Sequence, residues 1–522
     1  MAKRRLTTFS KFLLTMLVVG GLAYGYVYLR DSGALSGLTG EEGTSNKEEG
    51  KKTGGKKLSG DDVINIGVVT WGGYAGGQYF NEGFEANTNS RFYKDYGLKV
   101  NFEILDDFVA SRKAFENGEV DLLWSTVDAF PTEAGQLAGE PQIVFQADWS
   151  RGGDAIVARR GVNSVGDLKG KKIAVAELTP SHTFLLWLLE AGDLKQSDVI
   201  IEKFPSAIDA AAAFKADPSI NAAVVWSPDD EDCVRAVPGA KILENTKSAS
   251  NIIADVFLAK KNYIDDNKDK LAKLYEGWMK GAAEINNSDD AKRKAAKILA
   301  ENFNGFDEAT TYQAIENVRL CTHGDNMNFF GLNRNYQGVT GEKLYSKMSN
   351  EYAKLGYMDN RPPSWRLVSR SDVVNSANLV GSEHDAEAGK TFVKVTTEEG
   401  KQKEAIATKR LKIGFASGSY QLDGNAKTLI DLTFVDIAKA FSNSQIRIEG
   451  NTDNVGSKAT NISLSKKRAQ AVANYLIQTH GMPMERFIII GNGPSKPVAG
   501  CEGNSSAACK SKNRRTEFEL VK

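Results

Sequence analysis

The chain has 522 residues, which exceeds one ordinary domain of about 100–200 residues, so we expect several domains. Its 66 basic and 66 acidic side chains cancel, which excludes the broadly basic surface typical of nucleic-acid binding. A hydrophobic share of 41% and a charged share of 25% exclude disorder of the whole chain. Its four cysteines are too few for a disulfide scaffold and lack the CxxC spacing of a zinc site.

The N-terminus carries an uncharged apolar run at residues 12–29, preceded by basic residues and followed by Arg30. As a helix this run reaches about 27 Å, enough to cross a hydrocarbon core. The basic flank predicts a cytoplasmic N-terminus, so residues 1–31 are expected to be a single-pass inner-membrane anchor in contact with lipid. The bulk of the chain is then periplasmic. A cleaved signal peptide remains the alternative, with residues 21–23 as a possible cleavage region.

Residues 32–61 are rich in Gly, Glu, Lys, Ser and Thr and offer few large apolar side chains. A segment of this composition cannot bury a core, so we expect a flexible linker.

Residues 62–375 alternate short apolar runs with helical patterns. Strands are expected at residues 63–69, 98–105, 120–124, 173–176 and 222–226, and helices at 109–117 and up to 189. This alternation predicts an α/β fold with mostly parallel sheets. Ligands of such sheets bind beyond the carboxyl ends of the strands.

Polar and aromatic side chains stand at those predicted strand ends. The candidates for solute binding are Thr70, Trp71, Tyr74, Trp124, Ser125 and Trp226 from strand ends, and Thr179, Ser181 and His182 from a helix start. The aromatic rings suit a flat or cationic ligand, whereas a helix N-terminus suits an anionic group. The charge of the solute is therefore left open, and the tryptophans could instead be packing residues, and Thr179 or Ser181 helix caps.

Three motifs in this region carry a resemblance. The runs Gly152-Gly153-Asp154-Ala155-Ile156-Val157, Asp167-Leu168-Lys169-Gly170-Lys171-Lys172 and Trp226-Ser227-Pro228 resemble periplasmic solute-binding proteins of the nitrate, sulfonate, taurine and thiamine-precursor type. The resemblance implies two α/β lobes that close on a small molecule, with an ABC permease as partner. It also implies chain crossings near residues 146–154 and 251–256, and Asp255 in the second crossing joins the solute-binding candidates.

Catalytic motifs are missing from the sequence: there is no Gly-x-Ser-x-Gly turn, His-Glu-x-x-His helix or Walker loop. Enzymes of thiamine-pyrimidine synthesis share this wider fold but carry a cysteine cluster that this chain lacks. We therefore expect a binding protein with no catalytic residues, cofactor or metal.

Residues 376–390 are mostly small and polar and are expected to be a second linker. The last region, residues 391–522, predicts a smaller α+β domain. Strands are expected at residues 411–415, 446–450 and 487–490 and after residue 513, and helices at 425–441 and 461–477, with residues 390–407 as a possible initial strand or hairpin.

The second of these helices carries an arginine on its apolar face. On a helical wheel Arg468 falls between Leu464 and Val472, where a guanidinium needs an anion or hydrogen-bonded partners. Asp453 is the natural candidate. Spacing alone leaves two interpretations open: an internal salt bridge, or a site that the two charges share for a ligand.

Motifs around these two residues resemble the OmpA-like peptidoglycan-binding domain. They are Thr452-Asp453-x-x-Gly456, Leu464-Ser465-x-x-Arg468-Ala469, Gly491-x-Gly493 and Asn513-Arg514-Arg515. The resemblance implies that Asp453 and Arg468 bind the diaminopimelate of a peptidoglycan stem peptide, and Thr452, Asn461 and Arg514 are further candidates. Asn451 departs from the pattern, since a histidine often precedes the Thr-Asp pair.

Cys501 and Cys509 lie in a Gly- and Ser-rich insertion, and an oxidising periplasm predicts a disulfide between them. Whether Cys233 and Cys321 pair is left open.

These patterns together predict a membrane-anchored periplasmic protein that binds a small solute in a two-lobed cleft and attaches non-covalently to peptidoglycan, for ABC-type uptake or sensing. The alternative is a wall-linked structural or motor component whose solute-binding fold acts as a receptor or scaffold. A flagellar stator role is disfavoured because residues 12–29 contain no acidic side chain for ion passage.

Overall fold

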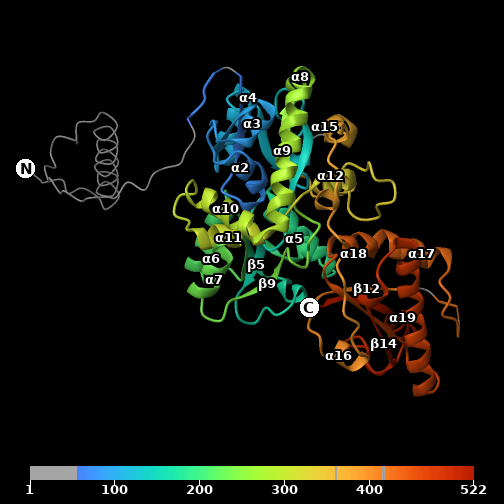
Figure 1. The fold of residues 1–522 in the computed structure, drawn as a ribbon. Coiled ribbons are helices and arrows are strands. Elements are labelled where there is room, and N and C mark those ends of the chain that lie inside the picture. Colours follow the sequence, from blue (N-terminus) through green and yellow to red (C-terminus); the bar gives the residue numbers. More distant parts are fainter. Residues whose placement is uncertain (1–55, 61, 359–360, 414, 417, 522) are drawn as a thin grey trace, which may run out of the picture. The chain divides into compact units, whose positions relative to one another are not determined.

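The computed structural model describes residues 56–60, 62–358, 361–413, 415–416 and 418–521. The predicted membrane helix at residues 12–29 lies outside these ranges. Within them, no helix combines the length and the apolar character needed to cross a membrane. The strands of the described residues form three sheets (Figure 1).

The first lobe is built on a six-stranded sheet in the order β11-β4-β10-β3-β1-β2. Its strands are β1 (Val63–Val68), β2 (Lys99–Ile104), β3 (Leu122–Thr126), β4 (Pro141–Ser150), β10 (Ala254–Lys260) and β11 (Val318–Leu320). Its longer helices are α4 (Phe108–Asn117), α9 (Lys268–Asn287), α10 (Asp289–Ala300), α11 (Glu308–Glu316) and α13 (Gly341–Lys354). Shorter ones are α2 (Ala75–Phe80), α3 (Arg91–Tyr96), α8 (Lys261–Asp266), α12 (His323–Phe329), α14 (Trp365–Val368) and α15 (Asp372–Ser376).

Helix α9 lies against this sheet (Figure 1). The side chain of Trp278 in α9 is fully buried. The Trp278 ring centroid lies 5.6 Å from Phe102, 5.2 Å from Phe145 and 4.8 Å from Phe257, one residue from each of three strands. Burial of aromatic rings of this size provides most of the stabilisation of such a core.

The second lobe has a five-stranded sheet in the order β7-β6-β8-β5-β9. Its strands are β5 (Asp154–Ala158), β6 (Lys172–Ala176), β7 (Ile200–Phe204), β8 (Ala222–Trp226) and β9 (Lys241–Asn245), and its helices α5 (Pro180–Ala191), α6 (Ala207–Ala216) and α7 (Asp229–Ala236). Alternate residues of each strand face opposite sides. Val157 and Val225 pack with α6 and α7, whereas Ile156 and Val224 belong to the core that contains α5.

The chain crosses between the lobes twice. It leaves the first sheet at Ser150, enters the second at Asp154, and returns from Asn245 to Ala254. This confirms the two-lobed fold and both predicted crossings. The expectation of mostly parallel sheets is wrong: β10 runs antiparallel to β3 and β4, and β5 antiparallel to β8 and β9. Two neighbouring parallel strands need a connection that runs back along the sheet, usually a helix. A strand that enters its sheet directly from the other lobe has no such connection, so it can run antiparallel to its neighbours.

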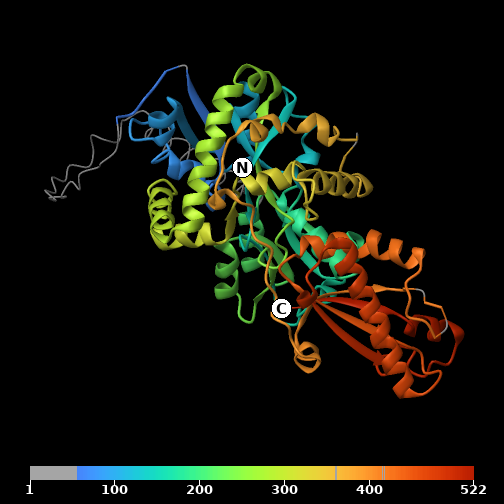
Figure 2. The same cartoon turned by 45° about the vertical axis from the view of Figure 1, so that its right-hand side comes forward.

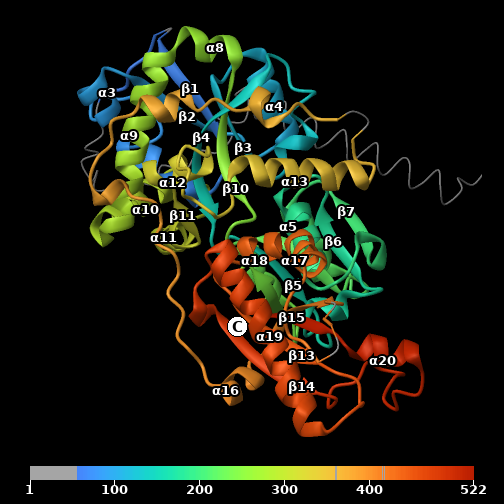
Figure 3. The same ribbon diagram turned by 90° about the vertical axis from the view of Figure 1, so that its right-hand side faces the viewer.

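The C-terminal region has a four-stranded sheet in the order β12-β15-β13-β14, seen with its helices in Figure 2 and Figure 3. The strands are β12 (Ala405–Leu411), β13 (Gln445–Asn451), β14 (Phe487–Gly493) and β15 (Thr516–Val521). The helices are α16 (Thr397–Gln402), α17 (Gly424–Ile430), α18 (Asp436–Ala440), α19 (Lys458–His480) and α20 (Ala507–Asn513), with a π-helical turn, Asp431–Val435, between α17 and α18.

Two details of this region differ from the prediction. The first strand ends at Leu411 instead of covering residues 411–415, and a helix, α16, precedes it. Strand β13 is buried along its whole length, although its alternation predicted a half-buried strand. The reason is a layer of paired charges on the second face: Arg447 is bonded to Glu519, and Lys496 lies 2.6 Å from Glu449.

The predicted linker at residues 376–390 packs against α12 in part. The Thr322 hydroxyl donates to the Asp385 carbonyl at 2.8 Å, and the Glu387 amide donates to Asp325 at 2.7 Å. The side chain of His384 is buried. This polar segment is therefore held by hydrogen bonds, which its composition did not indicate.

Candidate functional site

A small cavity of about 30 Å³ lies between the two lobes. It is formed where β1, β3 and β8 end and where β5, β10 and α5 begin. Its lining residues are Val69, Thr70, Trp71, Trp124, Thr126, Asp154, Pro180, Trp226, Ile253 and Asp255. The volume accommodates one or two water molecules.

Five of the residues predicted for solute binding line this cavity: Thr70, Trp71, Trp124, Trp226 and Asp255. Tyr74 lies behind them, and its hydroxyl donates to Asp255 Oδ2 at 2.5 Å. Ser125 instead donates to Glu133 at 2.9 Å. Strand ends were therefore a good guide to the residues that meet here, because both sheets direct these ends toward the cleft.

The helix-start candidates do not line the cavity, although their neighbour Pro180 does. Thr179 donates to the Ala176 carbonyl at 2.8 Å, and the buried Ser181 hydroxyl has no hydrogen-bond partner among the described residues. His182 is fully buried, and its ring lies 5.6 Å from Tyr352 and 5.2 Å from Tyr357.

His182 lies away from the cavity lining. Its Nε2 is paired with Gln196 at 3.0 Å, and burial lowers the pKa of the imidazole. His182 is therefore a neutral packing residue of the second lobe.

Sequence reasoning missed a group of carboxylates beside the cavity. Asp128, Asp148 and Asp154 are all buried and lie near Asp255. Burial raises the pKa of Asp128 and of Asp154 to about 7 in each case. Burial and mutual repulsion raise the pKa values of the Asp148–Asp255 pair as well. A signal was present, because an aspartate in the apolar run of β4 cannot be buried without a reason.

Several hydrogen-bonding groups around the cavity are buried without a partner in the described residues. They are Trp124 Nε1, Trp226 Nε1, Thr126 Oγ1 and Asp148 Oδ1. Only the second oxygen of Asp148 is engaged, accepting from Trp71 Nε1 at 3.1 Å. Buried polar atoms normally find partners, so these atoms mark a place where a ligand or water completes the bonding.

A second candidate site lies on the C-terminal region. A groove of about 280 Å³ is lined by Phe415, Asn451, Arg468 and Arg514, together with residues that follow β12, residues of β13 and α20, and the start of β15. Asp453 lies beside it, 2.6 Å from the guanidinium of Arg514. The internal salt bridge considered between Asp453 and Arg468 is therefore not formed. Asp453 pairs with Arg514 instead.

Arg468 is held without an ion pair in the described part of the chain. Its Nε donates to the Ser419 carbonyl at 3.0 Å, and its guanidinium lies 4.8 Å from the ring centre of Phe415. Burial and the adjacent Arg514 lower the pKa of Arg468. Two guanidinium groups beside one carboxylate give the groove a net positive charge, which suits a ligand carboxylate.

Thr452 and Asn461 hold the loop that carries Asp453. The Thr452 hydroxyl donates to the Asp453 carbonyl at 2.7 Å, and Asn461 Nδ2 donates to the Val455 carbonyl at 3.0 Å. Asp453 Oδ1 accepts the Val455 amide at 3.1 Å. Thr452 and Asn461, both predicted as site residues, therefore position the Asp453 carboxylate through the backbone of its loop.

The insertion before Arg514 is tied together in two ways. A disulfide joins Cys501 to Cys509, and Asn513 Nδ2 donates to the Cys501 carbonyl at 3.0 Å. The other two cysteines, Cys233 in α7 and Cys321 after β11, are free and buried, so the pairing left open does not occur.

Three carboxylates of the C-terminal sheet, Glu449, Glu517 and Glu519, have oxygens within 4.8 Å of one another. Each has a cationic partner: Lys496 for Glu449, Arg515 for Glu517 and Arg447 for Glu519. Paired in this way, the cluster is a structural charge network.

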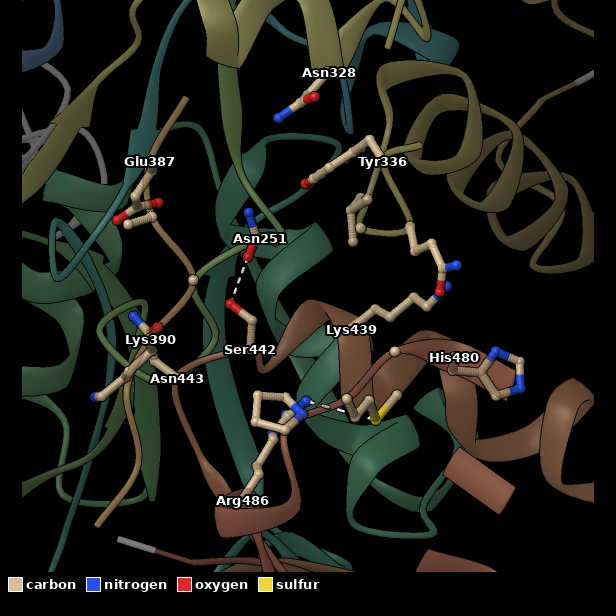
Figure 4. A pocket seen from close by; sticks show the side chains of 18 of the residues that line it. Asn251, Asn328, Tyr336, Glu387, Lys390, Lys439, Ser442, Asn443, His480 and Arg486 are labelled. Carbon is tan, nitrogen blue, oxygen red and sulfur yellow. Dashed lines mark hydrogen bonds between the residues drawn. The ribbon is translucent and has the colours of Figure 1, made fainter. Parts of the chain in front are cut away.

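A larger cavity, of about 620 Å³, is shown in Figure 4. Its walls hold Asn251, which accepts from Ser442 at 2.7 Å, and Arg486. The guanidinium of Arg486 is engaged by the protein itself, because it donates hydrogen bonds to the carbonyls of Ala438, Phe441 and Ser444. Burial lowers the pKa of Arg486 to about 9. No residue of this cavity was predicted from the sequence.

Comparison with known proteins matches the two regions separately. Residues 84–291 match the family model described as NMT1/THI5 like, and residues 414–511 match the OmpA family. The chain is 34% identical over 116 residues to the peptidoglycan-associated lipoprotein of Rhizobium meliloti, which is 22% of this chain and 63% of that protein. It is 38% identical over 85 residues to outer membrane porin F of Pseudomonas aeruginosa, which is 16% of this chain and 23% of the porin.

These sequence relatives are thus matched over less than two thirds of their own length. Among solved structures, the periplasmic aliphatic sulphonate binding protein SsuA of Escherichia coli aligns with a TM-score of 0.47 and 16% identity, over 61% of this chain and 100% of SsuA. The nitrate-binding protein NrtA of Synechocystis PCC 6803 aligns with a TM-score of 0.43 and 12% identity, over 60% of this chain and 87% of NrtA. The two family models thus match separate regions of the chain, NMT1/THI5 like at residues 84–291 and OmpA at residues 414–511.

Proposed function

We propose that this chain is an envelope protein that binds a small solute between its lobes and attaches non-covalently to peptidoglycan through its C-terminal region. The observation that carries the proposal is the pairing of an interlobe cavity with a separate charged groove at Asp453, Arg468 and Arg514. The two sites share no residue. Neither arrangement needs catalytic chemistry, so we propose a binding protein and not an enzyme.

For the wall, the proposed ligand is the diaminopimelate residue of a stem peptide, which carries an ammonium and a carboxylate. The Arg468 guanidinium, without a carboxylate partner in the described residues, would take the ligand carboxylate. Asp453, whose loop is fixed by Thr452 and Asn461, would take the ammonium, with Arg514 moving from Asp453 toward the ligand. Opposite charges in one groove support a ligand that carries both.

Sedimentation of the full chain with purified sacculi tests this proposal. Asp453→Ala and Arg468→Ala should each weaken binding by on the order of 2–5 kcal/mol, because each leaves a ligand charge unpaired. Lys458→Ala is the matched control, since it removes an exposed positive charge from the same helix, α19. Circular dichroism checks the fold of each variant. If both site variants are folded and pellet like the parent, the site assignment is wrong.

For location, we propose a single-pass inner-membrane anchor at residues 12–29, with the chain that follows it in the periplasm and an ABC permease or a sensory partner receiving the solute. The support is the uncharged run behind a basic flank and the linker at residues 32–61. A linker of about 30 such residues has an r.m.s. span of roughly 30 Å, which leaves the folded region free to reach the wall above the membrane.

A further inference from the structure

We propose that the interlobe cleft selects a small primary ammonium compound that carries an uncharged hydrogen-bond acceptor, held by Asp154 and Asp255 among Trp71, Trp124 and Trp226. This inference rests on the proposed solute-binding function and assigns the chemical class of its ligand. The sequence left this charge open, because aromatic strand ends and a helix N-terminus indicated opposite signs.

The first argument is charge. Asp154 and Asp255 line the cavity, Asp148 lies directly behind Trp71, and no Lys, Arg or His is among the described residues that line it. The nearest guanidinium groups already have partners. Arg112 is bonded through two nitrogens to Glu133 at 2.8 and 2.9 Å, and Arg151 lies 2.7 Å from Glu387. Once these carboxyl groups are ionised, an anion in this cavity would meet negative charges without a counter-charge, whereas an ammonium would meet its complement and favour the ionised form.

The second argument is the set of unpartnered buried atoms. Trp124 and Thr126 are 2% and 3% exposed, both line the cavity, and Trp124 Nε1 and Thr126 Oγ1 have no partner in the described residues. Trp226 Nε1 is in the same condition. Two indole N–H donors require acceptors, and a bare ammonium has none. A hydroxyl or carbonyl oxygen on the same ligand would satisfy them.

The third argument is the aromatic wall. Indole faces attract cations, most strongly where water is excluded. Trp71 reaches its position only because residue 153 is glycine: a Cβ there would lie 2.0 Å from the Trp71 ring. Likewise a Cβ on Gly73 would lie 1.5 Å from Asp148 Oδ2. Gly153 thus leaves room for the Trp71 ring, and Gly73 leaves room for the Asp148 carboxylate that accepts the Trp71 N–H. The positions of the ring and of the carboxylate in the cleft therefore depend on these two glycines.

Size decides between classes of cation. The cavity volume of about 30 Å³ suits an –NH3+ head group much better than a trimethylammonium group. A primary ammonium also offers three N–H donors, enough for both lining carboxylates, whereas a quaternary one offers none. The structure thus favours an amino alcohol or similar amine over a quaternary ammonium ligand.

Titration calorimetry and thermal unfolding of the full chain at pH 8.5 and low salt test the inference with ethanolamine as the probe. Ethylene glycol is its uncharged counterpart, choline its quaternary one and ethanesulfonate its anionic one. We expect ethanolamine alone to raise the melting temperature clearly. Asp154→Asn and Asp255→Asn should each weaken ethanolamine binding at least tenfold, whereas Asp95→Asn, an exposed carboxylate of α3, should leave it unchanged. Circular dichroism confirms that the variants fold.

The inference is overturned if ethanolamine does not bind, or if ethanesulfonate, ethylene glycol or choline binds more tightly than ethanolamine. It is also overturned if both Asn variants bind ethanolamine like the parent. These outcomes remain distinct from failure of the proposed function. If ethanesulfonate or ethylene glycol binds and Trp124→Ala abolishes that binding, the cleft is still the solute site, and only the assignment of an ammonium ligand is rejected. A cleft in which no compound of a broad solute library raises the melting temperature would reject solute binding itself.

Discussion

Removal of the charge of Asp154 should change how the stability of the solute-binding region depends on pH. Asp154 is 2% exposed, and burial raises its pKa to about 7, with the Ser150 hydroxyl opposing the shift and Asp230 adding to it. Its pKa in the unfolded chain is about 3.9. The folded state therefore binds this proton more tightly than the unfolded state.

The sign follows from linkage. The stabilisation from protonated Asp154 is fully present below about pH 4 and is lost as the pH rises through 7, because ionisation in the folded state leaves a buried charge. Three pKa units correspond to about 4 kcal/mol for this one group. Asp154→Asn should remove most of that loss. The variant should match the parent near pH 4 and exceed it in stability by about 1.5 kcal/mol at pH 5 and by about 4 kcal/mol at pH 8.

The assay is urea unfolding of the ligand-free full chain at pH 5, 6, 7 and 8, followed by tryptophan fluorescence. All seven tryptophans lie between residues 71 and 365, so the signal reports the solute-binding region alone. Other carboxyl groups near Asp154 also have raised pKa values: that of Asp128 is about 7, that of Asp148 about 8, and that of Asp255 lies well above its usual range. Arg151 is an opposing charge that lowers the pKa of Asp148. A residual pH dependence is therefore expected in the variant. An unfolding midpoint that falls as steeply between pH 5 and 8 in Asp154→Asn as in the parent, with Asp95→Asn as control, would refute the reasoning.

Three further predictions concern other parts of the chain. Trp226→Phe keeps an aromatic ring, although a smaller one, and removes an indole N–H that has no partner in the described residues, so calorimetry should show weaker ethanolamine binding with little change in melting temperature; equal affinity would mean that this N–H does not meet the ligand. Replacing Cys501 and Cys509 together by Ser should destabilise the C-terminal region by about 2–3 kcal/mol, measured by calorimetric unfolding, because the short disulfide loop no longer restricts the unfolded chain. Carbonate extraction of membranes should leave the protein in the pellet because of the run at residues 12–29, and its release would contradict the anchor.

The overall architecture could be predicted from the sequence, because strand ends and the Asp453 and Arg468 motifs leave local signals. Trp71, Trp124 and Trp226 come together as expected, since both lobes direct the carboxyl ends of β1, β3 and β8 toward the cleft. Strand direction was not predictable in the same way. β5 and β10 enter their sheets from the crossings, and periodicity carries no information on the direction of a strand.

The content of the site was harder to predict than its place. Asp128, Asp148 and Asp154 were not predicted as site residues because an acidic side chain usually faces water. The surroundings of His182 were also not predictable: its position at a helix start indicated a ligand, and its ring lies against Tyr352 and Tyr357, which come from distant segments. In the C-terminal region the partner of Asp453 proved to be Arg514, 61 positions away, a choice that depends on tertiary packing alone.

The most direct test of the central claim, that one chain holds a solute and the wall at separate sites, is co-sedimentation of the full chain with sacculi in the presence of radiolabelled ethanolamine. We predict that protein and label pellet together for the parent. Asp154→Asn should pellet without the label, and Arg468→Ala should leave both in the supernatant. Pelleting of the label with Asp154→Asn, or of the protein with folded Arg468→Ala, would contradict the account.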